Sequence, residues 1–318
     1  MARWLGLASL LAALLSLQSC VTTRADGSHQ ASAPANWKLP TMGGTQFWTD
    51  VYHRSGWRIQ RHFASGHFRL LDPSDYREVW GTRQNCQDKL DGLTQTIPAN
   101  RGTVLILAHG LGRTSNCWKP MAKLAQEQTD WQSIPFTYAS TRESIESQSE
   151  SLAQLIQSLG PNVQTIHFAG HSWGNIVIRH YLASASPSAR SRIGRFVMMG
   201  SPNQGSRMAR ILYPTLVFPL FAGSSIEAMG RGWNDLSRTL GTPPCEFGII
   251  AGGHRDNRQG WNPLLNGSSD GAVSLSEAML PGATDLLIKP LLHTTMMKDR
   301  NVCKATLRFL ESGRFVAK

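Results

Sequence analysis

Residues 163–185 read VQTIHFAGHSWGNIVIRHYLASA, and this stretch decides the fold. The apolar run Val163–Ala169 predicts a buried strand, and Asn175–Ala185 has the composition of a helix. Between them stands Ser172, with a glycine two residues away on each side. Glycine has no Cβ, so a strand and a helix that meet there can approach closely. The stretch therefore predicts a tight strand–turn–helix unit with the Ser172 hydroxyl exposed above a sheet.

From Arg101 onward, expected strands and helices alternate, which indicates a mainly parallel sheet with helices on both faces. The expected strands are Thr103–Ala108, Ile134–Tyr138, Thr165–Ala169, Phe196–Met199, Glu246–Ile250 and Leu286–Ile288. The expected helices are Trp118–Gln128, Ser144–Ser158, Asn175–Ala185 and Met296–Leu310. We take residues 101–318 as one α/β domain.

Two segments fall outside this alternation. Residues 46–100 carry aromatic residues in alternating segments, which predicts short strands and then a helix near Ser74–Leu93, packed as an extension on one edge of the sheet. Residues 201–244 contain the apolar run Ile211–Phe221, in which two prolines would break a long helix. This second segment forms either a cap with an acyl-binding face or an ordinary layer packed on the core.

An activated serine needs a base within hydrogen-bond reach and a carboxylate that orients the base. His293 follows the last expected strand and precedes the last expected helix, so it reaches the sheet edge that carries Ser172. Asp270 lies in a Ser-Ser-Asp-Gly turn after the strand Glu246–Ile250, whereas Asp256 lies closer to that strand in a loop of solvated composition. We favour Asp270 and keep Asp256 as the alternative. The predicted order is serine, aspartate, histidine.

Attack of a serine on an ester places negative charge on the carbonyl oxygen, which preorganised N–H groups stabilise. The backbone N–H of Trp173, directly after the serine, is one expected donor. The loop after the first expected strand reads AHGLGRT over residues 108–114, and the N–H of Leu111 is the second. His171 stands beside Ser172 but is expected to serve packing or a structural hydrogen bond.

Five motifs together resemble the bacterial α/β-hydrolase fold serine esterases and triacylglycerol lipases. They are His109–Thr114, Gly170–Gly174, Ser201–Ser206, Asp270–Val273 and His293-Thr294. The resemblance extends from Arg101 to the C-terminus. It implies the α/β-hydrolase fold and hydrolysis of carboxylic esters through an acyl-enzyme, without a cofactor. Asn175 departs from the family, in which a second small residue is frequent at that position.

The same residues suit more than one reaction. Acyl transfer, thioester hydrolysis and amide hydrolysis on envelope lipids use one acyl-enzyme, because water and other nucleophiles compete for it. A non-catalytic lipid-binding lipoprotein on a hydrolase scaffold is a further hypothesis, and the intact set of expected site residues argues against it. No metal is expected, because Asp and Glu clusters with calcium-loop spacing are missing from the sequence.

The N-terminus has the features of an export signal. Arg3 precedes the apolar stretch Trp4–Leu17, which is too short to span a bilayer and is typical of a signal peptide over residues 1–19. Leu17-Gln18-Ser19-Cys20 resembles the lipobox of bacterial lipoproteins, in which the cysteine becomes the lipid anchor; Gln18 departs from the usual residue there. Residues 20–45 have the composition of a flexible tether. We expect a protein of the bacterial cell envelope, held at the membrane surface and facing the periplasm or the exterior. The alternative is ordinary signal cleavage with Cys20 incidental.

The composition limits the kinds of partner that the protein is expected to bind. The chain has 318 residues, 41% of them hydrophobic, and a formal net charge of +11. A basic surface favours anionic head groups or nucleic acid. We find no dense Lys/Arg block, zinc spacing or aromatic-basic motif, so nucleic acid is not expected and an acyl ester is the expected partner.

Four cysteines follow Cys20, and an exported chain can form disulfides. Cys245 opens an expected strand, and Cys303 lies ten residues past His293 along a helix that descends from the functional edge. We therefore expect Cys245 to pair with Cys303 and Cys86 with Cys117. The alternative is four buried free thiols.

Overall fold

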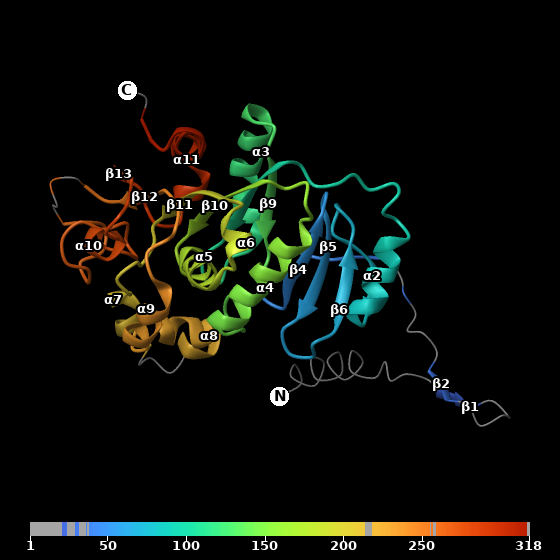
Figure 1. Cartoon of the computed structure of the whole chain (residues 1–318). Coiled ribbons are helices and arrows are strands. Elements are labelled where there is room, and N and C mark those ends of the chain that lie inside the picture. Colours follow the sequence, from blue (N-terminus) through green and yellow to red (C-terminus); the bar gives the residue numbers. More distant parts are fainter. Residues whose placement is uncertain are drawn as a thin grey trace, which may run out of the picture.

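The computed structural model describes residues 21–23, 29–31, 36, 38–213, 218–254, 256 and 259–316 (Figure 1). The expected signal peptide and the lipid-anchor residue Cys20 lie outside the described residues. Val21–Thr23 (β1) pairs antiparallel with His29–Ala31 (β2). Within the described ranges, no helix is both long enough and apolar enough to cross a membrane.

The larger sheet has six strands in the order β13-β12-β11-β10-β8-β9, and every neighbouring pair is parallel. Its strands are β8 (Thr103–Ala108), β9 (Gln132–Phe136), β10 (Thr165–His171), β11 (Ile193–Met199), β12 (Phe247–Gly252) and β13 (Asp285–Lys289). Each expected strand is present, and the prediction of a mainly parallel sheet is confirmed. Such sheets are covered on both faces, which explains the continuous apolar runs.

Side chains of β8 alternate between two cores because successive residues of a strand point to opposite faces. Val104 and Ile106 enter the core that contains buried residues of helices α4, α5 and α9, and Leu105 enters the core of α3 and α11. Figure 1 shows these helices on the two sides of the sheet. The helices on this sheet and around its edge are α3 (Lys119–Gln128), α4 (Ile145–Ser158), α5 (Trp173–Ser184), α6 (Pro187–Arg190), α7 (Arg207–Leu212), α8 (Phe218–Met229), α9 (Trp233–Leu240), α10 (Leu275–Ala278) and α11 (Arg300–Ser312), with 3₁₀ turns η1 (Ser115–Trp118) and η2 (Met296–Lys298).

The last expected helix is divided in two. The chain forms the 3₁₀ turn η2 and then begins α11 at Arg300, because the side chain of Asp299 accepts hydrogen bonds from the amides of Asn301 and Val302. A side chain that accepts from the first free amides starts a helix at its own position. The helix therefore begins four residues later than expected.

A second sheet lies beside the β9 edge of the first, as Figure 1 shows. It is antiparallel with the order β3-β7-β6-β5-β4. Its strands are β3 (Leu39–Pro40), β4 (Trp48–Arg54), β5 (Trp57–His62), β6 (Phe68–Leu71) and β7 (Tyr76–Gly81), followed by α2 (Arg83–Asp91). The sheet and α2 enclose a small core of their own.

The helix expected near Ser74–Leu93 is wrong over its first part, where β7 forms instead. Thr82 separates the two elements: its hydroxyl accepts from the amide of Asn85, and the Asn85 side chain accepts from the amide of Thr82. This reciprocal capping box begins the helix at Arg83. Pairing of β7 with β6 satisfies the backbone before that point.

The expected disulfides are wrong: the four described cysteines are free thiols. Cys245 packs against the core on the α5 face of the sheet, whereas Cys303 is buried in the core on the opposite, α11 face. Cys86 is buried in the core of the antiparallel sheet, and Cys117 packs against the α3 and α11 core. Each expected partner therefore lies in a different hydrophobic cluster. Burial raises the pKa of Cys86 and Cys245 to about 12, so few thiolates are available for oxidation.

We predict four reactive thiols per chain when a form that starts at Val21 is denatured without reductant and titrated with a thiol reagent. The native protein should react slowly, because burial keeps the thiols protonated. Two or no thiols after denaturation would contradict this and restore one or both disulfides.

Candidate functional site

Ser172 occupies the turn between β10 and α5 with φ 52° and ψ −122°. A positive φ strains any residue that has a Cβ, and such strain persists only where the surroundings hold it. The Ser172 amide donates to the carbonyl of Met199 at 2.9 Å. The Asn175 side-chain amide donates to the carbonyls of Ser172 and Met199, each at 3.1 Å. Asn175, the departure from the family pattern, therefore braces the turn.

The glycines of the turn are required by close approach. A Cβ on Gly174 would overlap the carbonyl oxygen of Ala108, and one on Gly170 would overlap the side chain of Asn175. A Cβ on Gly110 would lie 3.1 Å from the Cβ of Ser172, which places the loop after β8 directly against the serine.

His293 and Asp270 are joined by a hydrogen bond of 2.7 Å between Nδ1 and Oδ2. The His293 amide also donates to the Asp270 carbonyl at 2.8 Å. Asp270 is 1% exposed, and its other oxygen accepts from the amides of Ala272 and Val273 at 2.9 and 2.7 Å. A carboxyl group that pairs with Nδ1 fixes the orientation of the imidazole ring, so that Nε2 is the ring nitrogen left for another partner. Asp256, the alternative carboxylate, is exposed.

His171 lies against His293, with ring centroids 4.5 Å apart and a hydrogen bond of 2.8 Å between His171 Nε2 and the His293 carbonyl. Burial lowers the pKa of His171 well below its usual value, and His293 and Arg113 lower it further. A neutral ring therefore donates its Nε2 proton to the His293 backbone. This is the structural hydrogen bond expected from the sequence.

The side chain and the carbonyl of His109 make contacts that support the loop after β8. Its ring stacks on Tyr138 with centroids 4.3 Å apart, and its Nδ1 lies 2.9 Å from the carbonyl of Gly110. The Tyr138 hydroxyl donates to the His109 carbonyl. Burial lowers the pKa of His109 to about 4, so the ring is neutral at physiological pH. Both contacts hold the loop that carries Leu111.

The two expected oxyanion donors flank the serine. Leu111 lines the same cavity as Ser172, and Trp173 is the residue that follows the serine and opens α5. Among the described residues, neither backbone amide donates to a protein acceptor. This is consistent with the expected role of both N–H groups, which stays a prediction.

A cavity of about 250 Å³ contains Ser172 and His293 in its wall. Half of the other lining residues are apolar residues from α7, α8 and the loop after Asp270, namely Met208, Ala209, Leu212, Ile226, Met229, Ala272 and Val273. The rest include Leu111, Pro202 and the charged Arg113. A largely apolar cavity with a few convergent polar groups is typical of a small-molecule site. In the part of the chain that the structure describes, no group of three or more metal-ligating side chains is found.

The Ser201–Ser206 motif joins the loop after β11 to α10. Asn203 is buried; its side chain accepts from the Ser201 hydroxyl at 2.8 Å and donates to the Ala278 carbonyl at 2.8 Å. Pro202 and Ser206 of the motif line the cavity, and Asn203 connects this part of the wall to α10.

No protein-family model matches the chain, and a search of curated proteins finds no match. Among solved structures, the mature form of Bacillus licheniformis lipase BlEst2 is 20% identical, with a TM-score of 0.54 over 67% of this chain and 93% of that one. The propeptide form of the same lipase gives 20% identity and a TM-score of 0.53 over 67% of this chain and 50% of that one. This chain has the α/β-hydrolase fold. At this identity the likeness bears on the fold alone.

Sequence reasoning missed several residues that support the site. Gln46, Ser140 and Gln148 hold the loops around Ser172, yet none belongs to a motif or lies near the serine in sequence. Their roles depend on contacts between segments 25 to 67 residues apart, which no local pattern reveals.

We predict that His109 makes stability depend on pH. Its folded pKa of about 4 lies below the ordinary value of 6.5, so between these values the unfolded chain binds a proton that the folded chain does not. The free energy of unfolding should therefore fall as the pH is lowered from about 6.5 to 4, by up to about 1.4 kcal/mol per pH unit from this group.

His109→Asn keeps a donor near the Gly110 carbonyl but removes the titration. Urea unfolding at pH 7, 6 and 5 should show a shallower pH dependence in this variant than in the parent. His67→Asn, at an exposed histidine, serves as the control and should keep the parental slope. Equal slopes for parent and His109→Asn would contradict the prediction.

Proposed function

We propose that this chain is a serine carboxylic ester hydrolase that acts through an acyl-enzyme. The observation that supports it is the hydrogen bond between Asp270 and His293, because His293 lies in the wall of a cavity that Ser172 also lines. Ser172 occupies the strained turn between β10 and α5. The remote likeness to a lipase does not carry the proposal, which rests on the side chains of this chain.

In the proposed reaction, Ser172 Oγ attacks the acyl carbonyl carbon while His293 Nε2 takes the hydroxyl proton. Asp270 accepts the Nδ1 hydrogen bond and stabilises the imidazolium. The N–H groups of Leu111 and Trp173 bind the negative oxygen of the tetrahedral intermediate. The carbon–oxygen bond to the alcohol then breaks, and His293 returns the proton to the leaving oxygen.

Water completes the cycle. It attacks the acyl-enzyme with His293 as the base, and a second tetrahedral intermediate releases the carboxylic acid and regenerates Ser172. His171 does not compete as the base, because burial lowers its pKa well below the usual value, which makes the ring a weak proton acceptor, and its Nε2 already donates to the His293 carbonyl. No step requires a cofactor or a metal.

The cavity favours acyl groups over polar substrates. Met208, Leu212, Ile226 and Met229 line the same cavity as the serine, and their apolar side chains suit an aliphatic acyl chain. We therefore propose esters of lipid or other aliphatic acids as the substrate class.

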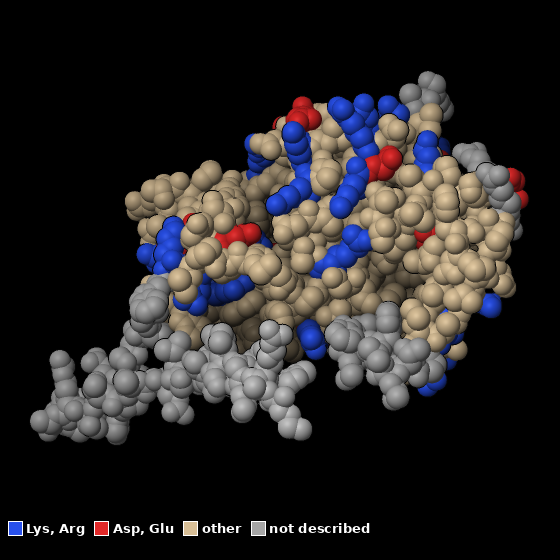
Figure 2. All heavy atoms as spheres, turned by 180° about the vertical axis from the view of Figure 1, so that it is seen from behind, with Lys and Arg blue, Asp and Glu red and all other residues tan. Residues whose placement is uncertain are grey.

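We also propose that the protein works at an anionic membrane surface of the cell envelope, anchored through Cys20. Figure 2 shows that basic side chains outnumber acidic ones on the face opposite the view of Figure 1. On α11, Arg300, Lys304 and Arg308 are exposed at four-residue spacing and so form one basic stripe. A basic surface attracts anionic head groups.

Ser172→Ala should lower turnover of a soluble p-nitrophenyl ester by about 10⁴–10⁶-fold, because the nucleophile is removed. A fluorophosphonate probe should label the parent and leave the variant unlabelled, and circular dichroism should show that the variant is folded. Retention of most activity would refute the proposed nucleophile.

Asp270→Asn should lower turnover by about 10⁴-fold, because His293 would lose the acceptor that fixes its tautomer. Asp256→Asn, the matched change at the exposed alternative, should keep parental turnover. The reverse result would transfer the role of the carboxylate to Asp256.

A further inference from the structure

The antiparallel sheet and the main domain meet at the loop between β9 and α4, residues 137–144. β4 lies along this loop: the Asp50 amide donates to the Thr137 carbonyl at 2.8 Å, and the Asp50 carboxylate accepts from the Thr137 amide at 2.9 Å. Two residues on, the Ala139 amide donates to the Thr49 hydroxyl at 3.0 Å. The antiparallel sheet thus supplies partners for the backbone of the loop.

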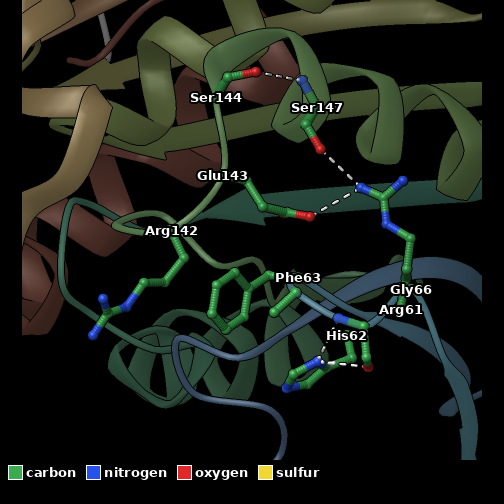
Figure 3. Close-up of a pocket in the computed structure, with 10 residues that line it drawn as sticks. Arg61, His62, Phe63, Gly66, Arg142, Glu143, Ser144 and Ser147 are labelled. Carbon is green, nitrogen blue, oxygen red and sulfur yellow. Dashed lines mark hydrogen bonds and ion pairs between the residues drawn. The ribbon is translucent and has the colours of Figure 1, made fainter.

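Glu143, near the end of this loop, accepts hydrogen bonds from two residues of the antiparallel sheet. Arg61 donates to its Oε1 at 2.9 Å, and the Thr49 hydroxyl donates to its Oε2 at 2.6 Å. Figure 3 shows the Arg61 side chain reaching from β5 to Glu143 and Ser147, while the Arg142 side chain points away. The Glu143 side chain is 4% exposed and the Arg61 side chain 24% exposed, so removal of Arg61 would leave a buried carboxylate without its cation, which is destabilising. The loop is therefore held rigidly by the antiparallel sheet.

The cavity in Figure 3, about 490 Å³, lies along the boundary between the antiparallel sheet and residues 137–144. Its walls combine the hairpin after β5 with the start of α4, and in the hairpin the Ser65 hydroxyl lies 2.9 Å from His62 Nδ1. The hydrogen bonds described above therefore connect the two sheets. They also affect the loops around Ser172, which lie next to residues 137–144.

Gln46, two residues before β4, reaches from the antiparallel sheet to both of those loops. Its Nε2 donates to the carbonyl of Arg113 at 2.6 Å. Its Oε1 accepts from the Ser140 hydroxyl at 2.9 Å and from the Thr141 amide and hydroxyl at 3.0 and 2.9 Å. One side chain thus ties the loop after β8 to the loop after β9.

The Ser140 hydroxyl that donates to Gln46 also accepts from the Gly112 amide at 3.0 Å. Gly112 has φ 67° and nothing within 4 Å of a Cβ position, so its own environment does not restrict it. The contacts from Ser140 and Gln46 therefore fix the chain directly after Leu111, whose N–H is a proposed oxyanion donor. On the other side, Gly110 is fixed by its close approach to Ser172.

The second proposed donor, Trp173, depends on the same loop. Its indole Nε1 donates to Gln148 Oε1 at 2.7 Å, and Gln148 Nε2 donates to the Glu143 carbonyl at 2.7 Å. The Ser225 hydroxyl, on α8, donates to the Ser140 carbonyl at 2.7 Å. Residues 140–143 therefore support the residues of both proposed donors.

We propose that Gln46 is a positioning residue for the oxyanion hole, so that the antiparallel sheet is part of the catalytic unit. This inference rests on the proposed ester hydrolysis at Ser172. Gln46 touches no substrate; it acts through Arg113 and Ser140 on the orientation of the Leu111 N–H. Since an oxyanion donor stabilises the transition state more than the ground state, its misplacement lowers kcat and leaves KM nearly unchanged.

Gln46→Ala and Gln46→Glu, made in the full chain, test the proposal with a soluble p-nitrophenyl ester. Glutamate retains the acceptor for Ser140 and Thr141 but replaces the donor to the Arg113 carbonyl with an oxygen. Both variants should lose about 10–100-fold in kcat with KM changed less than about 3-fold, because misplacing a donor costs less than the about 10²–10³-fold of removing one. Labelling of Ser172 by a fluorophosphonate, which also develops an oxyanion, should slow by a similar factor.

Gln84→Ala is the matched control, because Gln84 is an exposed glutamine on α2, the helix that packs on the antiparallel sheet. It should keep parental kcat and KM. Urea unfolding of each variant must show a folded protein at the assay temperature, so that a loss of kcat reports positioning and not unfolding. A kcat within twofold of the parent in folded Gln46→Ala and Gln46→Glu would overturn the inference.

The failure of this inference is distinct from the failure of the proposed function. If Ser172→Ala abolishes turnover while the Gln46 variants keep it, only the role of Gln46 is wrong. If Ser172→Ala keeps turnover, the reaction itself is wrong and the oxyanion assignment falls with it.

Discussion

The backbone of Ser172 is the constraint on which the site depends. A serine at φ 52° would relax to a more favourable conformation if its neighbours allowed it. Three features prevent this: the hydrogen bond from the Ser172 amide to the Met199 carbonyl, the hydrogen bonds that Asn175 donates to the carbonyls of Ser172 and Met199, and the close approach of Gly174 to Ala108, which only glycine permits. These contacts join β10, β11 and β8, so the strain at one residue is held by three strands of the sheet.

Parallel topology explains why the remaining groups gather at the same place. The loops that follow β8, β10, β12 and β13 all leave the carboxyl edge of the sheet, and ligand sites in open α/β sheets lie outside that edge. Asp270 and His293 come from two of these loops and are linked by a side-chain and a backbone hydrogen bond. The double link fixes the imidazole relative to a carboxylate that two backbone amides already hold.

The antiparallel sheet is connected to the main domain more closely than its separate core suggests. It encloses a core of its own, yet its polar contacts with residues 137–144 are buried and reach the loops around the serine. A buried polar network is stabilising only when its members are satisfied together. Asp50, Gln60 and Arg69 continue the same network into the sheet, with Gln60 bonded to both charged residues.

The sequence alone predicted much of the main sheet, because buried parallel strands such as Val104–Ala108 are uninterrupted apolar runs and because glycine marks the sharp turn at Ser172. It also predicted the order Ser172, Asp270, His293; the structure brings the last two into contact, and their catalytic roles remain a prediction. It was wrong about the helix before Arg83, where strand pairing and the Thr82 cap outweigh local composition, and about the disulfides, since spacing does not reveal on which face of a sheet a cysteine lies.

Local pattern therefore determined which segments become strands, helices and the serine turn, because those choices depend on hydrophobic periodicity and on glycine. Only the tertiary structure decided which distant side chains support that turn. The contacts of Gln46 with Arg113 and Ser140, and of Trp173 with Gln148, join segments whose separation along the chain carries no signal. Such hydrogen bonds form because burial leaves each polar group no water to bind, and that condition exists only after the chain has folded.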